Sequence, residues 1–157
     1  MLRSHDGITL FDMGVTAKLK YLGELIFQPL YIKWNDSNSV GIPIIDEQHR
    51  GIVTIVNSLH YLIRSGRAMD TLGPILNVFE HLALLHFETE EGLFVNSGFP
   101  ECKEHIQAHR NFFPQAQAAA REASSNGDTR IELDFLKKWW LGHINTEDKK
   151  YTQYCKR

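Results

Sequence analysis

Two pairs of metal-binding residue types, each spaced four residues apart, limit the folds open to this chain more than any other feature. The pairs are His86-x3-Glu90 and His105-x3-His109. A four-residue step along an α-helix turns through about 400°, so the members of each pair project from one face, a turn apart. A single pair of this kind is usually a contact between surface neighbours. Together, the pairs indicate a metal site if the rest of the chain brings further ligands to the same height.

Apolar residues recur at helical spacing in four segments, which are separated by short breaks rich in glycine, serine and asparagine. Four helices joined by short connections predict an all-α, up-down-up-down four-helix bundle. Residues 31–43 predict an N-terminal extended arm, with Trp34 packed over the end of the core. We expect Asp46 to cap the first helix and Gly66 to end it. The expected helices cover about residues 46–65, 69–95, 101–123 and 130–154.

The chain divides at about residue 30 into two parts. Residues 31–157 hold the expected bundle, and residues 1–30 form an N-terminal extension of unknown role. Apolar residues at helical spacing in the extension predict a short amphipathic helix before Pro29, formed around Leu19, Leu22, Leu25 and Ile26. Three roles stay open for the extension: packing on the bundle, contacting a partner protein or a second copy, and serving as a tail.

The bundle topology gathers histidines and acids at one of its ends. The starts of the first and third helices share that end with the finishes of the second and fourth helices. Chance placement rarely puts ligand-type residues there in all four. The other histidines, His5, His60 and His81, fall elsewhere, and we expect them not to be ligands. The seven candidate ligands are His49, His86, Glu90, His105, His109, His143 and Asp148.

One of these candidates does not fit a regular helix. His143 and Asp148 are five residues apart, so in an ideal helix they point about 140° away from each other. A local π-type turn, with about 4.4 residues per turn, would align them. We therefore predict a π-type turn between them, with a frayed helix end as the alternative.

The ligand set suits two metal ions better than one. Five imidazoles and two carboxylates are too many donors for a single ion, and zinc takes about four. The His105-x3-His109 segment also lacks the adjacent glutamate of a zinc protease helix. Two divalent first-row metals fit this set, with the carboxylates of Glu90 and Asp148 bridging them through both oxygens.

Four motifs in this chain closely resemble the ligand motifs of the hemerythrins, especially the bacterial branch, the bacteriohemerythrins. The resemblance covers about residues 31–154, and it is specific because four separate motifs agree in order and spacing. The motifs are Asp46-Glu-Gln-His49, His86-Phe-x2-Glu90-Glu91, His105-x3-His109 and His143-Ile-x3-Asp148-Lys149.

The resemblance implies a non-haem di-iron centre, Fe2+ or Fe3+, with an oxo or hydroxo bridge, that binds dioxygen reversibly. Carried over by position, one iron takes His105, His109 and His143 and is closed. The other takes His49 and His86 and keeps one open position, where dioxygen is expected. Glu91 is a candidate acceptor for a second imidazole nitrogen, although a solvated side chain is the commoner outcome.

One residue departs from the family pattern. The hemerythrins usually carry Trp-Leu ahead of the x2-His-Ile motif, and that leucine lines the oxygen pocket, whereas this chain has Trp139-Trp140. The resemblance therefore places Trp140, with Phe87 and Ile144, in the oxygen pocket. A bulkier indole would shrink the pocket, slow the arrival of oxygen, or donate a hydrogen bond.

Three classes of function are compatible with these observations. The first is a binding protein, an oxygen carrier, store or delivery protein that is not an enzyme. The second is a di-iron redox enzyme of the peroxidase or ferroxidase kind, although such centres usually carry paired Glu-x-x-His motifs that this chain lacks. The third is an oxygen or redox sensor that signals through residues 1–30.

Composition excludes other classes. The formal net charge is −2 and there is no basic run, which argues against a nucleic-acid partner. No apolar run approaches the ~18 residues of a membrane span, and the N-terminus has no signal-peptide pattern. The two cysteines, Cys102 and Cys155, match no zinc spacing. We expect reduced thiols in a cytoplasmic protein, with a single disulfide as the alternative.

Overall fold

The computed structural model describes residues 15–16, 29–65 and 68–155, without the side chains of residues 68–72. The expected amphipathic helix around Leu19–Ile26 lies outside the described residues, and so does His5. The described residues contain helices and turns but no strands.

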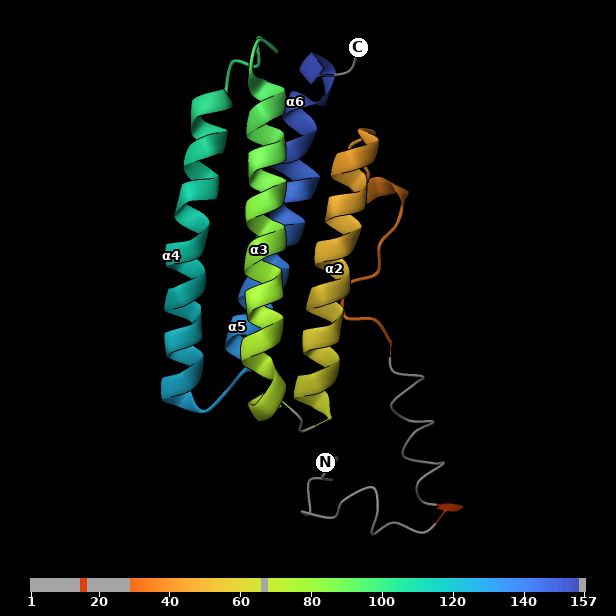
Figure 1. Cartoon of the computed structure of the whole chain (residues 1–157), viewed down its shortest axis with the longest axis vertical. Coiled ribbons are helices and arrows are strands. Elements are labelled where there is room, and N and C mark those ends of the chain that lie inside the picture. The colour runs from red at the N-terminus through yellow and green to blue at the C-terminus, as the bar shows by residue number, and fades with distance from the viewer. Residues whose placement is uncertain (1–14, 17–28, 66–67, 156–157) are drawn as a thin grey trace.

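Four long helical columns run side by side along the molecule (Figure 1). The first three columns are single helices. The fourth changes character partway, from an α-helix through a π-helical stretch, η2, to a second α-helix. The elements are α2 (Pro43–Arg64), α3 (Ala68–Phe94), α4 (Cys102–Asn126), α5 (Arg130–Gly142), η2 (His143–Glu147) and α6 (Asp148–Cys155). The expected all-α four-helix bundle is confirmed.

The helix ends differ from expectation at two places. Asp46 was expected to be the N-cap of the first helix, and this prediction is wrong because α2 already begins at Pro43. Proline suits a first turn because its missing N–H would have no helical partner there. The Asp46 carboxylate instead accepts hydrogen bonds from the backbone N–H of Val40 at 2.8 Å and of Gly41 at 3.2 Å. The third helix runs on to Asn126, where Gly127 closes it with a φ of 64°.

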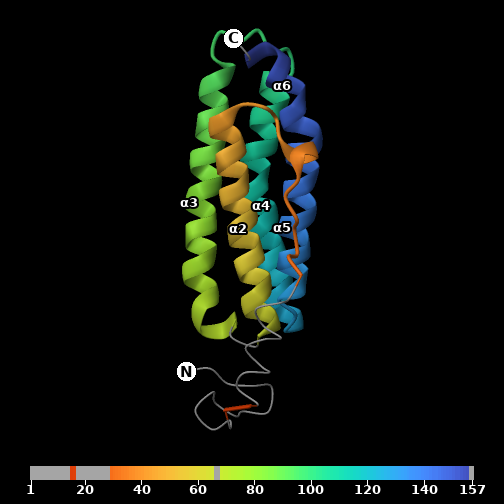
Figure 2. The ribbon, with the colours of Figure 1, turned by 90° about the vertical axis from the view of Figure 1, so that its right-hand side faces the viewer.

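The segment before α2 lies along the outside of the bundle, beside α2 and α5 (Figure 2). The Asn57 side chain fixes it by bonding both backbone groups of Ile32, at 2.8 and 2.9 Å. Within this arm, Asp36–Asn38 forms a short 3-10 turn, η1. Trp34 packs against the main core beside His49, with their ring centroids 6.1 Å apart, as expected of a residue that covers the core.

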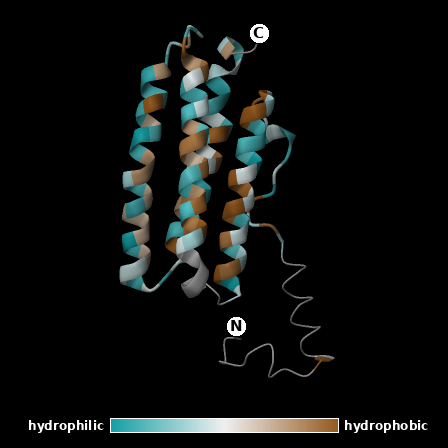
Figure 3. Cartoon of the chain, viewed as in Figure 1, coloured by the Kyte–Doolittle hydropathy of each residue, from teal (hydrophilic) through white to brown (hydrophobic). Residues whose placement is uncertain are grey.

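Each helix carries apolar and polar residues in alternation along its length (Figure 3), so the apolar faces can meet inside. The main core includes Ile52, Val56, Phe112 and Leu136. Phe94, Phe99 and Tyr151 form a second, smaller cluster. It is separated from the main core by the level at which the candidate ligand histidines lie. Among the described residues, no helix is both long and apolar enough to cross a membrane.

Candidate metal centre

The seven candidate ligands lie together inside the bundle and are closed off from solvent. They come from all four columns: α2, α3, α4, and the junction of η2 with α6. The structure therefore brings the seven candidate ligands together at one level of the bundle, as expected. The side chains are His49, His86, Glu90 and Asp148, each 0% exposed, with His105 and His109 at 2% and His143 at 4%.

The π-helical stretch aligns the last two candidates. It covers His143–Glu147 and ends immediately before Asp148. The wider turn brings Asp148 Oδ1 to 3.0 Å from His143 Nε2, although the residues are five apart in sequence. The π-type turn predicted from the sequence is confirmed, and the alternative of a frayed helix end is not needed.

The ligand atoms form two groups, each with its members within 4.8 Å of one another. We call these the three-histidine group, consisting of Glu90, His105, His109 and His143, and the two-histidine group, consisting of His49, His86, Glu90 and Asp148. Glu90 belongs to both groups. Asp148 also faces both, because its Oδ2 lies 3.0 Å from His49 Nε2 and its Oδ1 lies 3.0 Å from His143 Nε2. Each of these two adjacent groups could hold a metal ion.

The two shared carboxylates differ in orientation. Asp148 presents one oxygen to each group, as expected of a bridging carboxylate. Glu90 presents Oε2 to both groups, 3.1 Å from His109 Nε2 and 3.4 Å from His86 Nε2. Its Oε1 accepts a hydrogen bond from Tyr151 Oη at 2.5 Å. The phenol therefore holds the second oxygen of Glu90 in place.

Unpartnered buried atoms show that the site suits a metal. Both ring nitrogens of His49 and of His86, Nδ1 of His105 and both oxygens of Asp148 are buried without a hydrogen-bond partner. Leaving so many polar atoms unpaired in an apolar interior is costly. Imidazole nitrogens and carboxylate oxygens are donors that divalent first-row metals accept. Cations bound between the groups would satisfy the Nε2 atoms of His49 and His86 and the Asp148 oxygens, whereas the Nδ1 atoms of His49, His86 and His105 would keep no partner.

The electrostatics of the two groups differ. Burial lowers the pKa of His86 to about 4, so this imidazole is neutral at pH 7. Burial also disfavours the charged form of His143, but the negative charges of the nearby Asp148 and Glu90 prevail and raise its pKa to about 9. Burial opposes ionisation of Glu90 as well, yet the surrounding histidines hold the pKa of this carboxyl well below its usual range.

Neighbouring side chains fix two imidazoles of the three-histidine group, His109 and His143. Glu91 was expected to be solvated more often than bonded, but its Oε1 lies 3.2 Å from Nδ1 of His109. Phe87 stacks on His109 with a centroid distance of 4.0 Å, and Trp139 stacks on His143 at 4.4 Å. A carboxylate on the second ring nitrogen is the usual way in which a metal-binding histidine is oriented.

Trp140 adjoins the other group. The indole is fully buried and stands edge-on to both imidazoles, at centroid distances of 5.6 Å from His49 and 5.2 Å from His86. Its Nε1 has no hydrogen-bond partner. Of the other expected pocket residues, Ile144 is buried in the main core, and Phe87 lies nearer to His109 than to His86. A free N–H donor thus lies in the aromatic shell of the two-histidine group.

Tyr151, which bonds Glu90, was not predicted from the sequence to be a site residue. Its only signal was its place, three residues after Asp148, on the next turn of the same helix. His60 and His81, the other histidines among the described residues, lie apart from the site, as expected. His60 stacks on Tyr31 at a centroid distance of 4.5 Å, and Nδ1 of His81 lies 2.7 Å from the carbonyl oxygen of Asn77.

Comparison with known proteins agrees with this geometry. The family model for the hemerythrin HHE cation binding domain matches residues 40–155. The bacteriohemerythrin of Stenotrophomonas maltophilia (strain R551-3) is 28% identical over 124 residues, which is 78% of this chain and 80% of that protein. The bacteriohemerythrin of Pseudomonas aeruginosa (strain LESB58) is 27% identical, covering 77% of this chain and 79% of that protein. A hemerythrin-like protein of Naegleria gruberi is 28% identical over 78% of this chain and 92% of its own length.

The fold and the site define a cation-binding helical bundle with buried histidine and carboxylate ligands. The match over residues 40–155 shows that the chain belongs to the hemerythrin family and is a non-haem iron-binding domain of that family.

Proposed function

We propose that this protein binds dioxygen reversibly at a pair of iron ions and acts as an oxygen carrier, store or delivery protein. The observation that carries the proposal is the pairing of two unequal ligand groups around shared carboxylates. A pair of ferrous ions supplies reversible two-electron chemistry with dioxygen. Membership of the hemerythrin family supports both the metal and the ligand.

The proposed ligand assignment follows the two groups. His105, His109 and His143 hold one iron, and His49 and His86 hold the other. Glu90 and Asp148, which face both groups, would hold both ions, and an oxo or hydroxo group would be a further ligand. Among the described residues, the first iron thus has one more imidazole than the second. The open position for dioxygen is therefore on the side of His49 and His86.

The residues around that open position favour binding over turnover. Trp140 and Trp34 lie against the two-histidine group and exclude water from it. Exclusion of water protects a bound small molecule from side reactions. The Trp140 Nε1–H is available as a donor to a ligand at this position. We therefore propose that the protein is not an enzyme, with an oxygen or redox sensor and a di-iron redox enzyme as the competing functions.

The same proposal includes a cytoplasmic setting. Both cysteines are free thiols and each is partly buried against the small apolar cluster. Free thiols of this kind are typical of a reducing compartment.

The test is an optical titration of anaerobically reduced, iron-loaded protein with air. Reversible binding predicts that a colourless sample gains a visible charge-transfer band and loses it when oxygen is removed. Direct conversion to the diferric form, with no band that reverses, would contradict reversible binding and favour the sensor or the enzyme. Steady consumption of added peroxide or Fe(II) would then identify the enzyme.

A further inference from the structure

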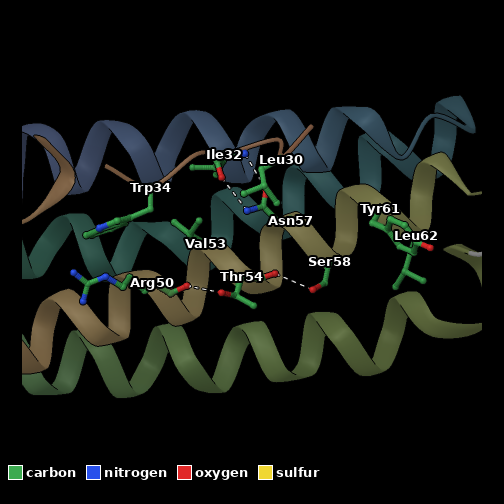
Figure 4. A pocket seen from close by; sticks show the side chains of 10 residues that line it. All are labelled: Leu30, Ile32, Trp34, Arg50, Val53, Thr54, Asn57, Ser58, Tyr61 and Leu62. Atoms are coloured by element: carbon green, nitrogen blue, oxygen red, sulfur yellow. Dashed lines mark hydrogen bonds between the residues drawn. The ribbon is translucent and has the colours of Figure 1, made fainter. Parts of the chain in front are cut away.

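An open groove runs along the outer face of α2, beside the arm that precedes the helix (Figure 4). It has a volume of about 630 Å³. One wall is formed by the arm residues Leu30, Ile32 and Trp34, and the floor is formed by residues of α2 from Arg50 to Leu62. The groove is distinct from the metal centre, since none of the candidate ligands lines it.

The floor of the groove is more apolar than its sequence indicates. Thr54 and Ser58 turn their hydroxyls towards their own helix, donating to the carbonyls of Arg50 and Thr54, each at 2.8 Å. The Asn57 amide is occupied by the backbone of Ile32. These polar groups are therefore satisfied within the structure and offer little to a polar ligand.

The chain itself supplies a segment with the right chemistry. Leu19, Leu22, Leu25 and Ile26 would share one face of a helix, whereas Lys20 and Glu24 would lie on the opposite face. The segment ends close to the groove, because Leu30, which forms part of its wall, is only four residues beyond Ile26. Leu30 is itself 66% exposed, which leaves an apolar surface at the point where the segment joins.

The lengths also match. At about 1.5 Å per residue, the floor from Arg50 to Leu62 extends for roughly 18 Å, and a helix over residues 19–27 for roughly 12 Å. Pro29 stands between the segment and the wall of the groove, and proline commonly ends a helix and starts a turn. A reversal there would place the segment back along the groove.

We propose that residues 19–27 dock as an amphipathic helix in this groove of their own chain. The short connection favours the chain's own segment over a second copy, since a short tether sets a local concentration in the millimolar range. Docking would cover Leu30 and the floor around Thr54, and would place the extension near Trp34, which neighbours His49.

Trypsin cleavage after Lys20 in the full-length protein tests this proposal. Cleavage inside a docked helix requires the segment to open, so its rate follows the open fraction. A synthetic peptide of residues 15–28 gives the rate for an undocked segment. We expect cleavage in the protein to be at least about tenfold slower than in the peptide, as burial of one or more leucines requires.

Two variants and two controls make the test specific. Leu22→Asp removes an apolar contact from the segment, and Thr54→Glu places a charge on the groove floor without altering the segment. Each is expected to speed cleavage by about tenfold. Glu24→Gln, on the opposite face of the segment, and Ala118→Glu, at an exposed site on α4, are expected to leave the rate unchanged.

Three outcomes would overturn the proposal. In the first, the protein is cleaved as fast as the peptide. In the second, Leu22→Asp speeds cleavage but Thr54→Glu does not, which would place the segment elsewhere on the protein. In the third, protection increases with protein concentration, which would assign the groove to a second copy. None of these outcomes depends on iron, so failure here leaves the proposed oxygen binding untouched.

Discussion

The three-histidine group and the two-histidine group share carboxylates but differ in what surrounds them. In the three-histidine group, aromatic rings lie flat on His109 and His143, and Glu91 fixes Nδ1 of His109. In the two-histidine group, no hydrogen-bond partner reaches Nδ1 of either histidine, and Nδ1 of His105 in the other group lacks a partner as well. The indole of Trp140 stands edge-on to both of those rings.

Under the proposed function, this difference assigns metal retention to one group and ligand exchange to the other. Stacked rings restrain His109 and His143, and Glu91 fixes Nδ1 of His109, which suits permanent retention of a metal. The two-histidine group has one imidazole fewer and a dry aromatic wall, which suits a position that admits and releases a small ligand. Five predictions test this division, beginning with the largest expected effect.

Loss of the Glu90 carboxylate should affect the two groups alike, because Glu90 belongs to both. In Glu90→Gln we expect both irons to be lost, with affinity falling by more than the ~10–100-fold typical of a residue that only supports a ligand. Metal analysis of purified protein measures this. Glu91→Gln is the matched control and should retain both irons with weaker binding. Full iron content in Glu90→Gln would show that neither group needs this residue.

Loss of one histidine should separate the two groups. His49→Gln should remove the iron of the two-histidine group and the oxygen band while keeping the other iron. His143→Gln should weaken the iron of the three-histidine group first. Iron content measured alongside the visible spectrum distinguishes the two variants. Identical losses in both would mean that the ions bind only as a unit.

The stability of the metal-free protein should peak near pH 6.5, because the two groups respond to pH in opposite directions. The lowered pKa of His86 means that stability is lost as pH falls from about 6.5 through about 4. The raised pKa of His143 means that stability present below pH 6.5 is lost as pH rises through about 9. Each limb is worth at most about 3 kcal/mol.

Denaturant unfolding of the metal-free protein across pH 4–9 measures these limbs. His143→Gln should flatten the alkaline limb and His86→Gln the acid limb. A profile that stays unchanged in both variants would assign the pH dependence to other groups. Iron binding near pH 7 should also release a proton from His143, because a metal requires the neutral imidazole.

Removal of the Tyr151 hydroxyl should loosen Glu90 and so affect both groups moderately. Hydrogen bonds to charged groups are worth about 1.5–3 kcal/mol, so Tyr151→Phe should weaken iron binding by roughly tenfold or more. Competition with a chelator measures the change. Tyr154→Phe, which alters a partly exposed phenol one turn from the site, should leave iron binding as it is. An effect of equal size in both variants would contradict a specific role for Tyr151.

The smallest effect is expected from replacing Trp140 or Trp139, and the two variants should differ in the property that changes. If Trp140 donates its N–H to bound oxygen, Trp140→Leu loses about 1 kcal/mol and should speed oxygen release about fivefold. Trp139→Leu, which removes the ring stacked on His143, should change iron retention more than oxygen release. Stopped-flow deoxygenation measures the release rate. Oxygen kinetics that stay the same in Trp140→Leu would rule out this role.

Much of the site could be foreseen because its spacing follows helical geometry. The steps from His86 to Glu90 and from His105 to His109 fix a shared face wherever the segment is helical. Even the π-helical turn could be predicted, since His143 and Asp148 would point about 140° apart in a regular helix. The ligand roles of the seven residues remain predictions until metal is measured.

Other features could not be foreseen because they depend on which columns meet. The spacing from Asp148 to Tyr151 does not reveal that the phenol reaches Glu90, a residue 61 positions earlier. Asp46 is of a residue type typical of N-caps, but α2 already begins at Pro43. The Asp46 carboxylate instead accepts a hydrogen bond from the backbone of the arm. Glu91 was a candidate acceptor for an imidazole nitrogen, yet only the packing of α3 against α4 shows that its partner is His109.

The sequence by itself therefore determined the bundle, the level at which its ligand-type residues gather, and the local turn that aligns the last of them. These follow from periodicity along single helices, which a sequence records directly. The tertiary structure alone decided the orientation of Glu90, the contacts of Trp140 with two imidazoles and the groove along α2. These depend on side chains from separate helices or from the arm, whose relative positions are set by packing.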